Sequence, residues 1–253
     1  MIRALTRSIP ASFAQALSAV PPDPAIDVVL ARAQHAAYSA ALEACGVAVE
    51  ALASDEACPD GCFVEDTAVV VGDRALITRP GAPSRRAETA SVGAALARWL
   101  ELVVMSEPAT LDGGDCLRIG DTLYVGRSAR SNAPGIAQLA VLGLRVVAVE
   151  LPPGVLHLKC VCSPIGADRV LLAEGSIPAA TFDAAIVWVP AAETYAANAV
   201  AVGDQVIVAE GYPRTHEALA AAGFTVHAVP TSEVQKADGS LTCQSIVFGA
   251  PGR

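Results

Sequence analysis

Five short stretches of the sequence carry side chains that could do chemistry together. They contain Glu65-Asp66, Asp112, His157, Asn198 and Cys243. A thiolate attacks electrophilic carbon, a neighbouring imidazole transfers protons, and a carboxylate orients the imidazole and stabilises its charged form. We therefore interpret Cys243, His157 and Asp112 as candidates for a nucleophile, a proton carrier and an orienting acid.

Each candidate stretch precedes a copy of one repeated pattern: an apolar run, a Gly-Asp type turn and a second apolar run. Gly and Asp permit the positive φ of tight turns, so the pattern predicts β-hairpins. The turn glycines recur about every 45 residues, an interval typical of one repeated supersecondary unit. The copies span residues 67–81, 115–128, 161–175, 198–211 and, truncated, 243–252, with turn glycines at Gly72, Gly120, Gly166, Gly203 and Gly249.

Helical patterns lie between the hairpins. Residues 88–100 carry Val92, Leu96, Trp99 and Leu100 on one helical face. A helix at 215–223 is expected to start at a capping Thr215 and to end at Gly223, and Asp27–Cys45 also has a helical pattern. Further apolar runs follow at 100–105, 144–150 and 225–230. The predicted unit is strand, strand, helix, strand, and about five units fit the chain.

Such units cannot bury their apolar faces alone, so they must pack in a row or around a ring. In a ring of five, the short last strand completes the first sheet, and the residues before each hairpin face the centre. We predict a five-bladed α/β propeller in a single domain over residues 1–253, with a doubly wound α/β sheet as the alternative. The helices and the lack of Trp-Asp motifs argue against a WD-type propeller.

The composition indicates a globular protein with a cationic ligand. Of the 253 residues, 53% are hydrophobic and 17% charged, and the formal net charge is -9. This charge argues against a nucleic-acid partner. No apolar run approaches the roughly 20 residues of a membrane span. Polar residues and Pro10 interrupt the N-terminal stretch where a signal peptide would need an apolar core, so we expect a cytoplasmic protein.

The seven cysteines are expected to be reduced thiols, because their number is odd and they are spread over a long chain. A zinc site is an alternative for four of them, although C-x₃-C with C-x-C is not the usual spacing. Those four are Cys58, Cys62, Cys160 and Cys162. Cys45 and Cys116 are interpreted as core residues. We predict no metal and no cofactor, and we interpret the glycines of "LDGGD" as a bend and not as part of a calcium loop.

Three carboxylates crowd the start of an apolar strand at Asp60, Glu65 and Asp66. Carboxylates that enter a protein interior require a cation, and the planar fork of a guanidinium matches them in a bidentate way. Arg85, Arg86 and Arg130 supply positive charge for a substrate α-carboxylate. For Arg85 and Arg86, a solvent-exposed loop is the alternative interpretation.

Taken together, these motifs resemble a known family. The segments "CFVEDTAVV", "ALITRPGAPSRRAE", "ATLDGGDCL", "LHLKCVCS" and "KADGSLTCQS" are similar to those of the dimethylarginine dimethylaminohydrolases of the guanidine-modifying pentein superfamily. The resemblance covers about residues 58 to 245 and implies a propeller of five α/β units.

The resemblance also implies roles for individual residues. Cys243 is then the nucleophile, His157 the proton donor and general base, and Asp112 the partner of His157. Substrate-binding residues implied by it are Leu17 in an N-terminal lid, Asp60, Glu65, Asp66, Arg85, Arg130 and, through its main chain, Ala237.

The implied reaction is hydrolysis of dimethylarginine, and of monomethylarginine, to citrulline and an amine through a covalent thiouronium on Cys243. An arginine or agmatine deiminase is the nearest alternative. A non-catalytic binding protein on the same propeller is an alternative of another class. The expected partner is a small cationic guanidino amino acid, without nucleic acid or membrane, and both a monomer and a homodimer stay open.

Overall fold

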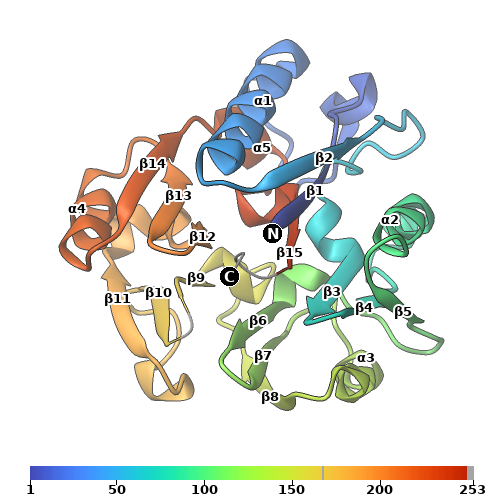
Figure 1. Cartoon of the computed structure of the whole chain (residues 1–253). Coiled ribbons are helices and arrows are strands. Elements are labelled where there is room, and N and C mark those ends of the chain that lie inside the picture. Colours follow the sequence, from blue (N-terminus) through green and yellow to red (C-terminus); the bar gives the residue numbers. More distant parts are fainter. Residues whose placement is uncertain (167, 250–253) are drawn as a thin grey trace.

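The computed structural model describes residues 1–166 and 168–249, and its strands form five three-stranded sheets around a centre (Figure 1). Positions 167 and 250–252 of the predicted hairpins lie outside the described residues. In each sheet the inner strand is antiparallel to the middle strand, and the outer strand is parallel to it. This arrangement confirms the predicted five-bladed α/β propeller over the doubly wound alternative.

The strands have short and similar lengths in all five sheets. The inner strands are β3 (Ala68–Val71), β6 (Cys116–Ile119), β9 (Cys162–Pro164), β12 (Val200–Val202) and β15 (Ile246–Phe248). The middle strands are β4 (Arg74–Ile77), β7 (Thr122–Arg127), β10 (Arg169–Ala173), β13 (Gln205–Ala209) and β1 (Arg3–Arg7). The outer strands are β5 (Glu101–Val104), β8 (Arg145–Glu150), β11 (Ala185–Val189), β14 (Thr225–Val229) and β2 (Ala48–Leu52).

The two ends of the chain close the ring within one sheet. β15 pairs antiparallel with β1, with Leu5 opposite Ile246 and Arg3 opposite Phe248, and β1 pairs parallel with β2. β15 lies near the centre of the molecule in Figure 1. The predicted closure of the ring by the last strand is therefore confirmed.

Gly-Asp turns help to set the register of the sheets β3-β4-β5 and β6-β7-β8. Gly72 and Gly120 have φ of 60° and 52°, which a residue without Cβ adopts at little cost. The carbonyl of the next residue then accepts from the first amide of the outer strand: Asp73 O from Glu101 N at 2.8 Å, and Asp121 O from Arg145 N at 3.1 Å. The turn thus aligns all three strands of a sheet.

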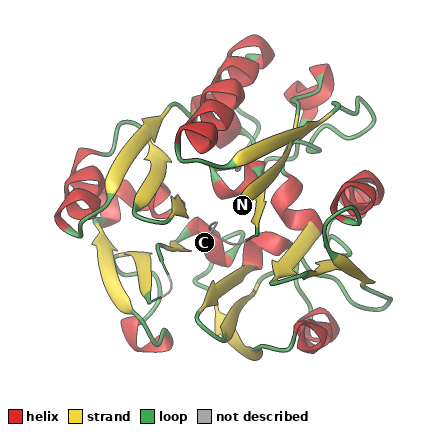
Figure 2. Cartoon of the chain, in the orientation of Figure 1, coloured by secondary structure: helices red, strands yellow, loops and turns green. Residues whose placement is uncertain are grey.

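Four α-helices lie outside the ring of sheets (Figure 2): α1 (Val28–Ala44), α2 (Thr89–Leu96), α3 (Ala133–Gln138) and α4 (Pro213–Ala221). The short α5 (Ser232–Lys236) contacts α1. The Asp27 carboxylate caps α1 by accepting from the amides of Val29 and Leu30, as its helical pattern predicts.

Two predicted helix boundaries are wrong. Thr215 does not cap α4, because the helix already starts at Pro213. The amide and the hydroxyl of Thr215 donate to the Glu193 carboxylate. α2 ends at Leu96, four residues before the end of its apolar pattern. Between β10 and β11, all described, the only helical segment is the three-residue η7 (Ala179–Thr181), so this unit departs from the predicted strand, strand, helix, strand order.

A short 3₁₀ segment precedes every inner strand, and the candidate residues at the hairpins lie within it or directly beside it. These segments are η2 (Val64–Thr67), η4 (Gly113–Asp115), η6 (Leu158–Cys160), η8 (Ala191–Ala197) and η9 (Thr242–Gln244). The remaining 3₁₀ segments are η1 (Ala11–Gln15), η3 (Pro83–Glu88) and η5 (Leu139–Leu142). Apolar clusters between neighbouring sheets and their helices hold the blades together.

Candidate active site

The 3₁₀ segments that precede the inner strands meet around the centre of the ring. η2 contacts both η4 and η9, and η6 contacts both η4 and η8. Asp112 and His157 are the residues directly before η4 and η6, Asn198 directly follows η8, and Cys243 lies within η9. The predicted convergence of distant segments is confirmed.

A cavity of about 200 Å³ opens at this point, and we call it the Cys243 cavity. Residues of the predicted site that border it are Leu17, Asp60, Asp66, Arg85, Arg130, His157, Ala237 and Cys243. Asp112 lies directly behind His157, whereas Glu65 lies elsewhere. Phe63, Leu156 and Asp238 also border the cavity and were not singled out from the sequence.

His157 lies between two carboxylates. Its Nε2 is 3.1 Å from Asp112 Oδ2, and its ring and the carboxylates of Asp66 and Asp112 offer polar atoms that lie within 4.8 Å of one another. Burial alone would lower the pKa of His157, but Asp66, Asp112 and Asp115 raise it to about 9. His157 is therefore an imidazolium at neutral pH and can donate a proton.

The two glycines of "LDGGD" are required by close approach. A Cβ on Gly113 would lie 2.0 Å from the carbonyl oxygen of Glu65, and one on Gly114 would lie 2.8 Å from His157 Nδ1. Gly114 N also donates to Asp66 Oδ1 at 2.9 Å. The glycines thus let η4 pack directly against the imidazole and Asp66, a more specific role than the predicted bend.

Asp115 anchors the backbone beside His157. Its Oδ1 accepts from Leu158 N at 3.1 Å, and its Oδ2 accepts from Ser131 Oγ at 2.6 Å. Burial raises the pKa of Asp115, while His157 and the hydroxyl donors oppose that rise. The residue fixes the start of η6 and with it the direction of the imidazole.

Cys243 is partly buried, and its two neighbours in η9 are held from opposite sides. Thr242 N donates to Asn198 Oδ1 at 2.9 Å. Gln244 Nε2 donates to Ser240 O, which leaves Oε1 to accept from His35 Nδ1 at 2.8 Å. Burial and then the nearby carboxylates Glu65 and Asp66 raise the pKa of the Cys243 thiol well above its ordinary value. Without a cation in the cavity, the thiol is therefore protonated.

Arg85 is buried, so a solvent-exposed loop is the wrong interpretation for this residue. Its Nη1 contacts Asp66 Oδ2, and its Nε and Nη2 contact both oxygens of Glu88 at 3.1 and 2.8 Å. Burial alone would raise the pKa of Asp66, but His157 and Arg85 lower it to about 2. Arg86 does not border the Cys243 cavity, and its Nε donates to Pro80 O at 3.2 Å. Glu88 was not singled out from the sequence, although its spacing of three residues from Arg85 is visible in "SRRAE".

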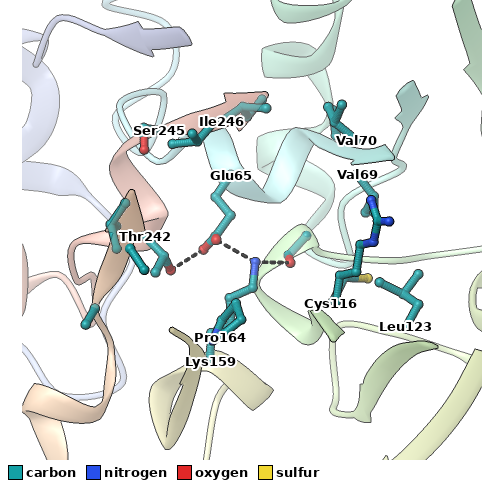
Figure 3. A pocket seen from close by; sticks show the side chains of 17 residues that line it. Glu65, Val69, Val70, Cys116, Leu123, Lys159, Pro164, Thr242, Ser245 and Ile246 are labelled. Carbon is teal, nitrogen blue, oxygen red and sulfur yellow. Dashed lines mark hydrogen bonds and ion pairs between the residues drawn. The ribbon is translucent and has the colours of Figure 1, made fainter. Parts of the chain in front are cut away.

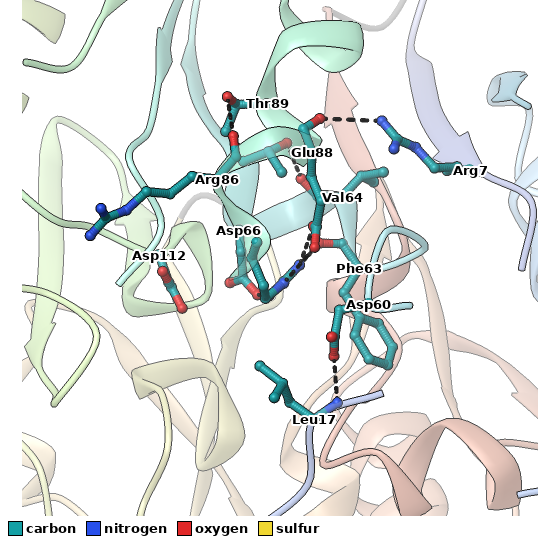
Figure 4. A network of polar contacts seen from close by, with 12 residues as sticks. Arg7, Leu17, Asp60, Phe63, Val64, Asp66, Arg86, Glu88, Thr89 and Asp112 are labelled. Carbon is teal, nitrogen blue, oxygen red and sulfur yellow. Dashed lines mark hydrogen bonds and ion pairs between the residues drawn. The ribbon is translucent and has the colours of Figure 1, made fainter. Parts of the chain in front are cut away.

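A short N-terminal segment covers one side of the Cys243 cavity. Leu17 N donates to Asp60 Oδ1 at 3.0 Å (Figure 4). Ala19 N donates to the carboxylate of Asp238. Leu17 is 41% exposed, whereas Ala237 is buried in the cavity wall. Arg130 Nη1 lies 3.9 Å from Asp112 Oδ2, and 23% of the Arg130 side chain stays exposed.

Glu65 does not join this cavity. Its Oε1 lies 2.6 Å from Lys159 Nζ, and its Oε2 accepts from Thr242 Oγ1 at 2.7 Å (Figure 3). Asn198 Nδ2 donates in turn to Thr242 Oγ1 at 3.0 Å. Glu65, Lys159 and Thr242 border a second cavity of about 230 Å³, the Glu65 cavity. Lys159 was not singled out from the sequence, where the only feature that points to it is its position two residues after His157.

The described residues do not bring the cysteines of the zinc alternative into a cluster of three or more potential ligands. The only such group among them is Asp66, Asp112 and His157. Its carboxylates already contact Arg85 and Arg130, so we treat it as part of the proton chemistry. All seven cysteines are described, and none forms a disulfide.

Known proteins show the same sequence and fold. Residues 23–196 match the model of the family described as "N,N dimethylarginine dimethylhydrolase, eukaryotic". The chain is 39% identical over 229 residues to an N(G),N(G)-dimethylarginine dimethylaminohydrolase of Pseudomonas aeruginosa, covering 88% of this chain and 90% of that one. It is 42% identical over 228 residues to the enzyme of that name from Streptomyces coelicolor, covering 87% of each.

Solved structures agree with these relatives. A Cys-to-Ser mutant of the P. aeruginosa dimethylarginine dimethylaminohydrolase complexed with citrulline superposes with a TM-score of 0.92 at 36% identity, covering 98% of this chain and 100% of that one. The N-terminal domain of a cyanobacterial arginine dihydrolase, 21% identical, shares the fold with a TM-score of 0.88 and covers 97% of each chain. On the family match and the two curated relatives, this chain belongs to the dimethylarginine dimethylaminohydrolase family.

Proposed function

We propose that the protein hydrolyses Nω,Nω-dimethyl-L-arginine, and Nω-monomethyl-L-arginine, to L-citrulline and dimethylamine or methylamine. The observation that carries this proposal is the single cavity in which the Cys243 thiol and the His157 imidazolium lie beside the carboxylates of Asp60 and Asp66. A cationic guanidinium fits carboxylates, and a thiol with an imidazolium suits covalent acyl-type chemistry at its carbon. The names of the P. aeruginosa and S. coelicolor relatives support the same reaction.

In the first half-reaction, the bound guanidinium brings positive charge beside a thiol whose pKa is otherwise raised by burial and carboxylates. This charge lowers the pKa of Cys243, and the thiol loses its proton to solvent, because His157 is already protonated. The thiolate forms a bond to the guanidinium carbon. His157 donates its proton to the dimethyl-substituted nitrogen, the C–N bond breaks, and dimethylamine leaves a cationic thiouronium on Cys243.

In the second half-reaction, His157 is neutral and can act as a base. It takes a proton from water, and the resulting hydroxide adds to the thiouronium carbon. The C–S bond breaks with its electron pair on Cys243, the proton of the added hydroxyl passes to that thiolate, and the neutral ureido group of citrulline is left. Asp112, fully buried and 3.1 Å from Nε2, holds the ring and stabilises each charged state.

We assign the remaining predicted residues to substrate recognition. Asp66 and Asp60 supply carboxylates toward the cationic parts of the substrate, and Arg130 and Arg85 supply donors for its α-carboxylate. Leu17 and Ala237 border the same cavity and offer main-chain groups. Glu65 is assigned an indirect part, because its carboxylate already contacts Lys159 and Thr242.

Product analysis tests the reaction. Purified wild-type protein and Cys243→Ser are incubated separately with dimethylarginine, monomethylarginine, arginine and agmatine. We expect citrulline and dimethylamine from the first substrate and none from the variant. Ammonia from arginine or agmatine would move the protein to the deiminases, and no turnover of any substrate would favour the non-catalytic alternative.

We also propose that the protein acts in the cytoplasm on a free amino acid, without nucleic acid. The seven unpaired thiols and the net charge of -9 support this proposal. Within residues 1–166 and 168–249, we found no helix with the length and apolar character of a membrane span. Size-exclusion chromatography with light scattering would decide between the monomer and the homodimer.

A further inference from the structure

Four of the five N–H donors of Arg85 are used by the described protein itself. Nε donates to Glu88 Oε1 at 3.1 Å, Nη2 donates to Glu88 Oε2 and to Phe63 O at 2.8 Å each, and Nη1 donates to Asp66 Oδ2. A guanidinium carries five donors, so one N–H of Nη1 remains. Arg85 is 5% exposed and still borders the Cys243 cavity, so this N–H is the donor it can offer to a ligand.

Glu88 determines the plane of that guanidinium. Both of its carboxylate oxygens bind the same arginine, three residues earlier in η3, and this fork-to-fork contact fixes orientation as well as distance. Glu88 is 1% exposed, and the described lining of the Cys243 cavity does not include it. Any effect of Glu88 on a ligand in the cavity must therefore pass through Arg85.

Glu88 is itself fixed from behind. The buried Arg7 of β1 donates from Nη2 to the Glu88 carbonyl at 3.3 Å and to Ser91 Oγ at 2.6 Å (Figure 4). Arg7 is 81 residues away in sequence, so the first blade braces the loop of the second. The chain of contacts runs from Arg7 through Glu88 to Arg85 and ends at the cavity.

We propose that Glu88 is a positioning residue that aims the remaining N–H of Arg85 at the α-carboxylate of the substrate. The inference rests on the proposed function and extends it to a residue that does not touch the substrate. Without this fork, the guanidinium would be held only by Asp66 and the Phe63 carbonyl, and it could rotate about its last side-chain bonds. Glu88 then governs recognition of the amino-acid end of the substrate, and it has little influence on the reacting guanidinium carbon.

The test compares two ligands on the same enzyme. KM is measured for dimethylarginine, and KI is measured for dimethylagmatine, which lacks the α-carboxylate, as a competitor. Both constants are independent of the fraction of folded enzyme. The variants are Glu88→Gln, Glu88→Asp in case the first does not fold, and the matched control Glu101→Gln, which removes a solvent-exposed contact with Arg74.

We expect Glu88→Gln to raise the KM for dimethylarginine about tenfold, because a hydrogen bond to a charged group is lost, with the KI of dimethylagmatine changed less than about twofold. Glu88→Asp keeps the charge but cannot span both donors, so a smaller rise in KM is expected. Glu101→Gln should change neither constant. In an Arg85→Gln background, Glu88→Gln should add no further rise, since both changes remove one interaction.

Two results would overturn the proposal. Equal rises in KM and KI would show that Glu88 acts on the whole cavity, through Asp66 for example. A lowered Tm with an unchanged KM would leave Glu88 a merely structural residue. If wild-type protein does not hydrolyse dimethylarginine, the proposed function fails instead, and calorimetric binding of arginine against agmatine would still test Glu88.

Discussion

The Cys243 cavity and the Glu65 cavity are of similar size and lie against the same central segments. They differ in how far their buried charged groups are already paired within the protein. In the Glu65 cavity, Lys159 and Thr242 use both oxygens of Glu65, and Asn198 completes the network. In the Cys243 cavity, burial would lower the pKa of His157, but the nearby carboxylates raise it. Burial and then nearby carboxylates raise the pKa of Cys243. Buried polar groups with strongly shifted pKa values thus indicate a reactive site. Buried polar groups whose hydrogen-bond partners all lie within the protein indicate a structural role.

The largest effect should come from removing the negative charge of Asp112, which lies directly behind His157. We expect Asp112→Asn to lower kcat by about 10³-fold, because the imidazolium of His157 loses its buried anionic partner at 3.1 Å. Steady-state kinetics and a melting curve measure this. The matched control is Asp121→Asn at an exposed hairpin turn, and an Asp112→Asn enzyme with nearly normal kcat would contradict the role given to Asp112.

The Glu65 cavity should respond in stability more than in chemistry. Lys159→Met leaves the carboxylate of Glu65 buried without its cation, and we expect a loss of about 3 kcal/mol in the free energy of unfolding. The double variant with Glu65→Gln should recover most of it, since no unpaired charge remains. Urea unfolding of both variants measures this difference. A double variant as unstable as Lys159→Met would show that the lost stability does not come from an unpaired Glu65 carboxylate.

The pH dependence of stability sharpens the same contrast. A histidine whose pKa rises from 6.5 to about 9 on folding stabilises the protein fully below pH 6.5, and this contribution is lost as the pH rises through 9. We expect the stability advantage of wild type over His157→Gln to shrink by at most about 3 kcal/mol over this range. Unfolding curves from pH 6 to pH 10 measure it, and an advantage independent of pH would argue against a raised pKa.

The smallest effect concerns the reactivity of Cys243. A small guanidinium ion held in the cavity should accelerate alkylation of Cys243 severalfold, because positive charge lowers the raised thiol pKa. Mass spectrometry at Cys243 follows the modification, with Cys243→Ser reporting the background from other thiols. Unchanged alkylation with a bound ligand that does not block the thiol would count against this electrostatic account.

Glu65 and Arg85 illustrate where prediction from the sequence stopped. The family resemblance implied that Glu65 binds the substrate, but its carboxylate contacts Lys159, 94 residues away along the chain, and Thr242, 177 residues away. The burial of Arg85 depends on Glu88, which is local, and on Asp66 and Phe63, which are not. Thr215 matched a capping residue and still lies inside α4, because its hydroxyl binds Glu193. A local pattern contains no information on such distant partners.

The blades and the repeat positions of the reactive residues follow from local sequence patterns. Apolar runs, Gly-Asp turns and a repeat of about 45 residues place Asp112, His157 and Cys243 at similar points of their units, and ring closure then brings them together. Which carboxylates stay available depends on the packing of the blades. Asp66 and Glu65 are neighbours in sequence, yet the short η2 turns one toward His157 and the other toward Lys159. A buried carboxylate requires a positive charge, and that charge comes from whichever blade packs against it.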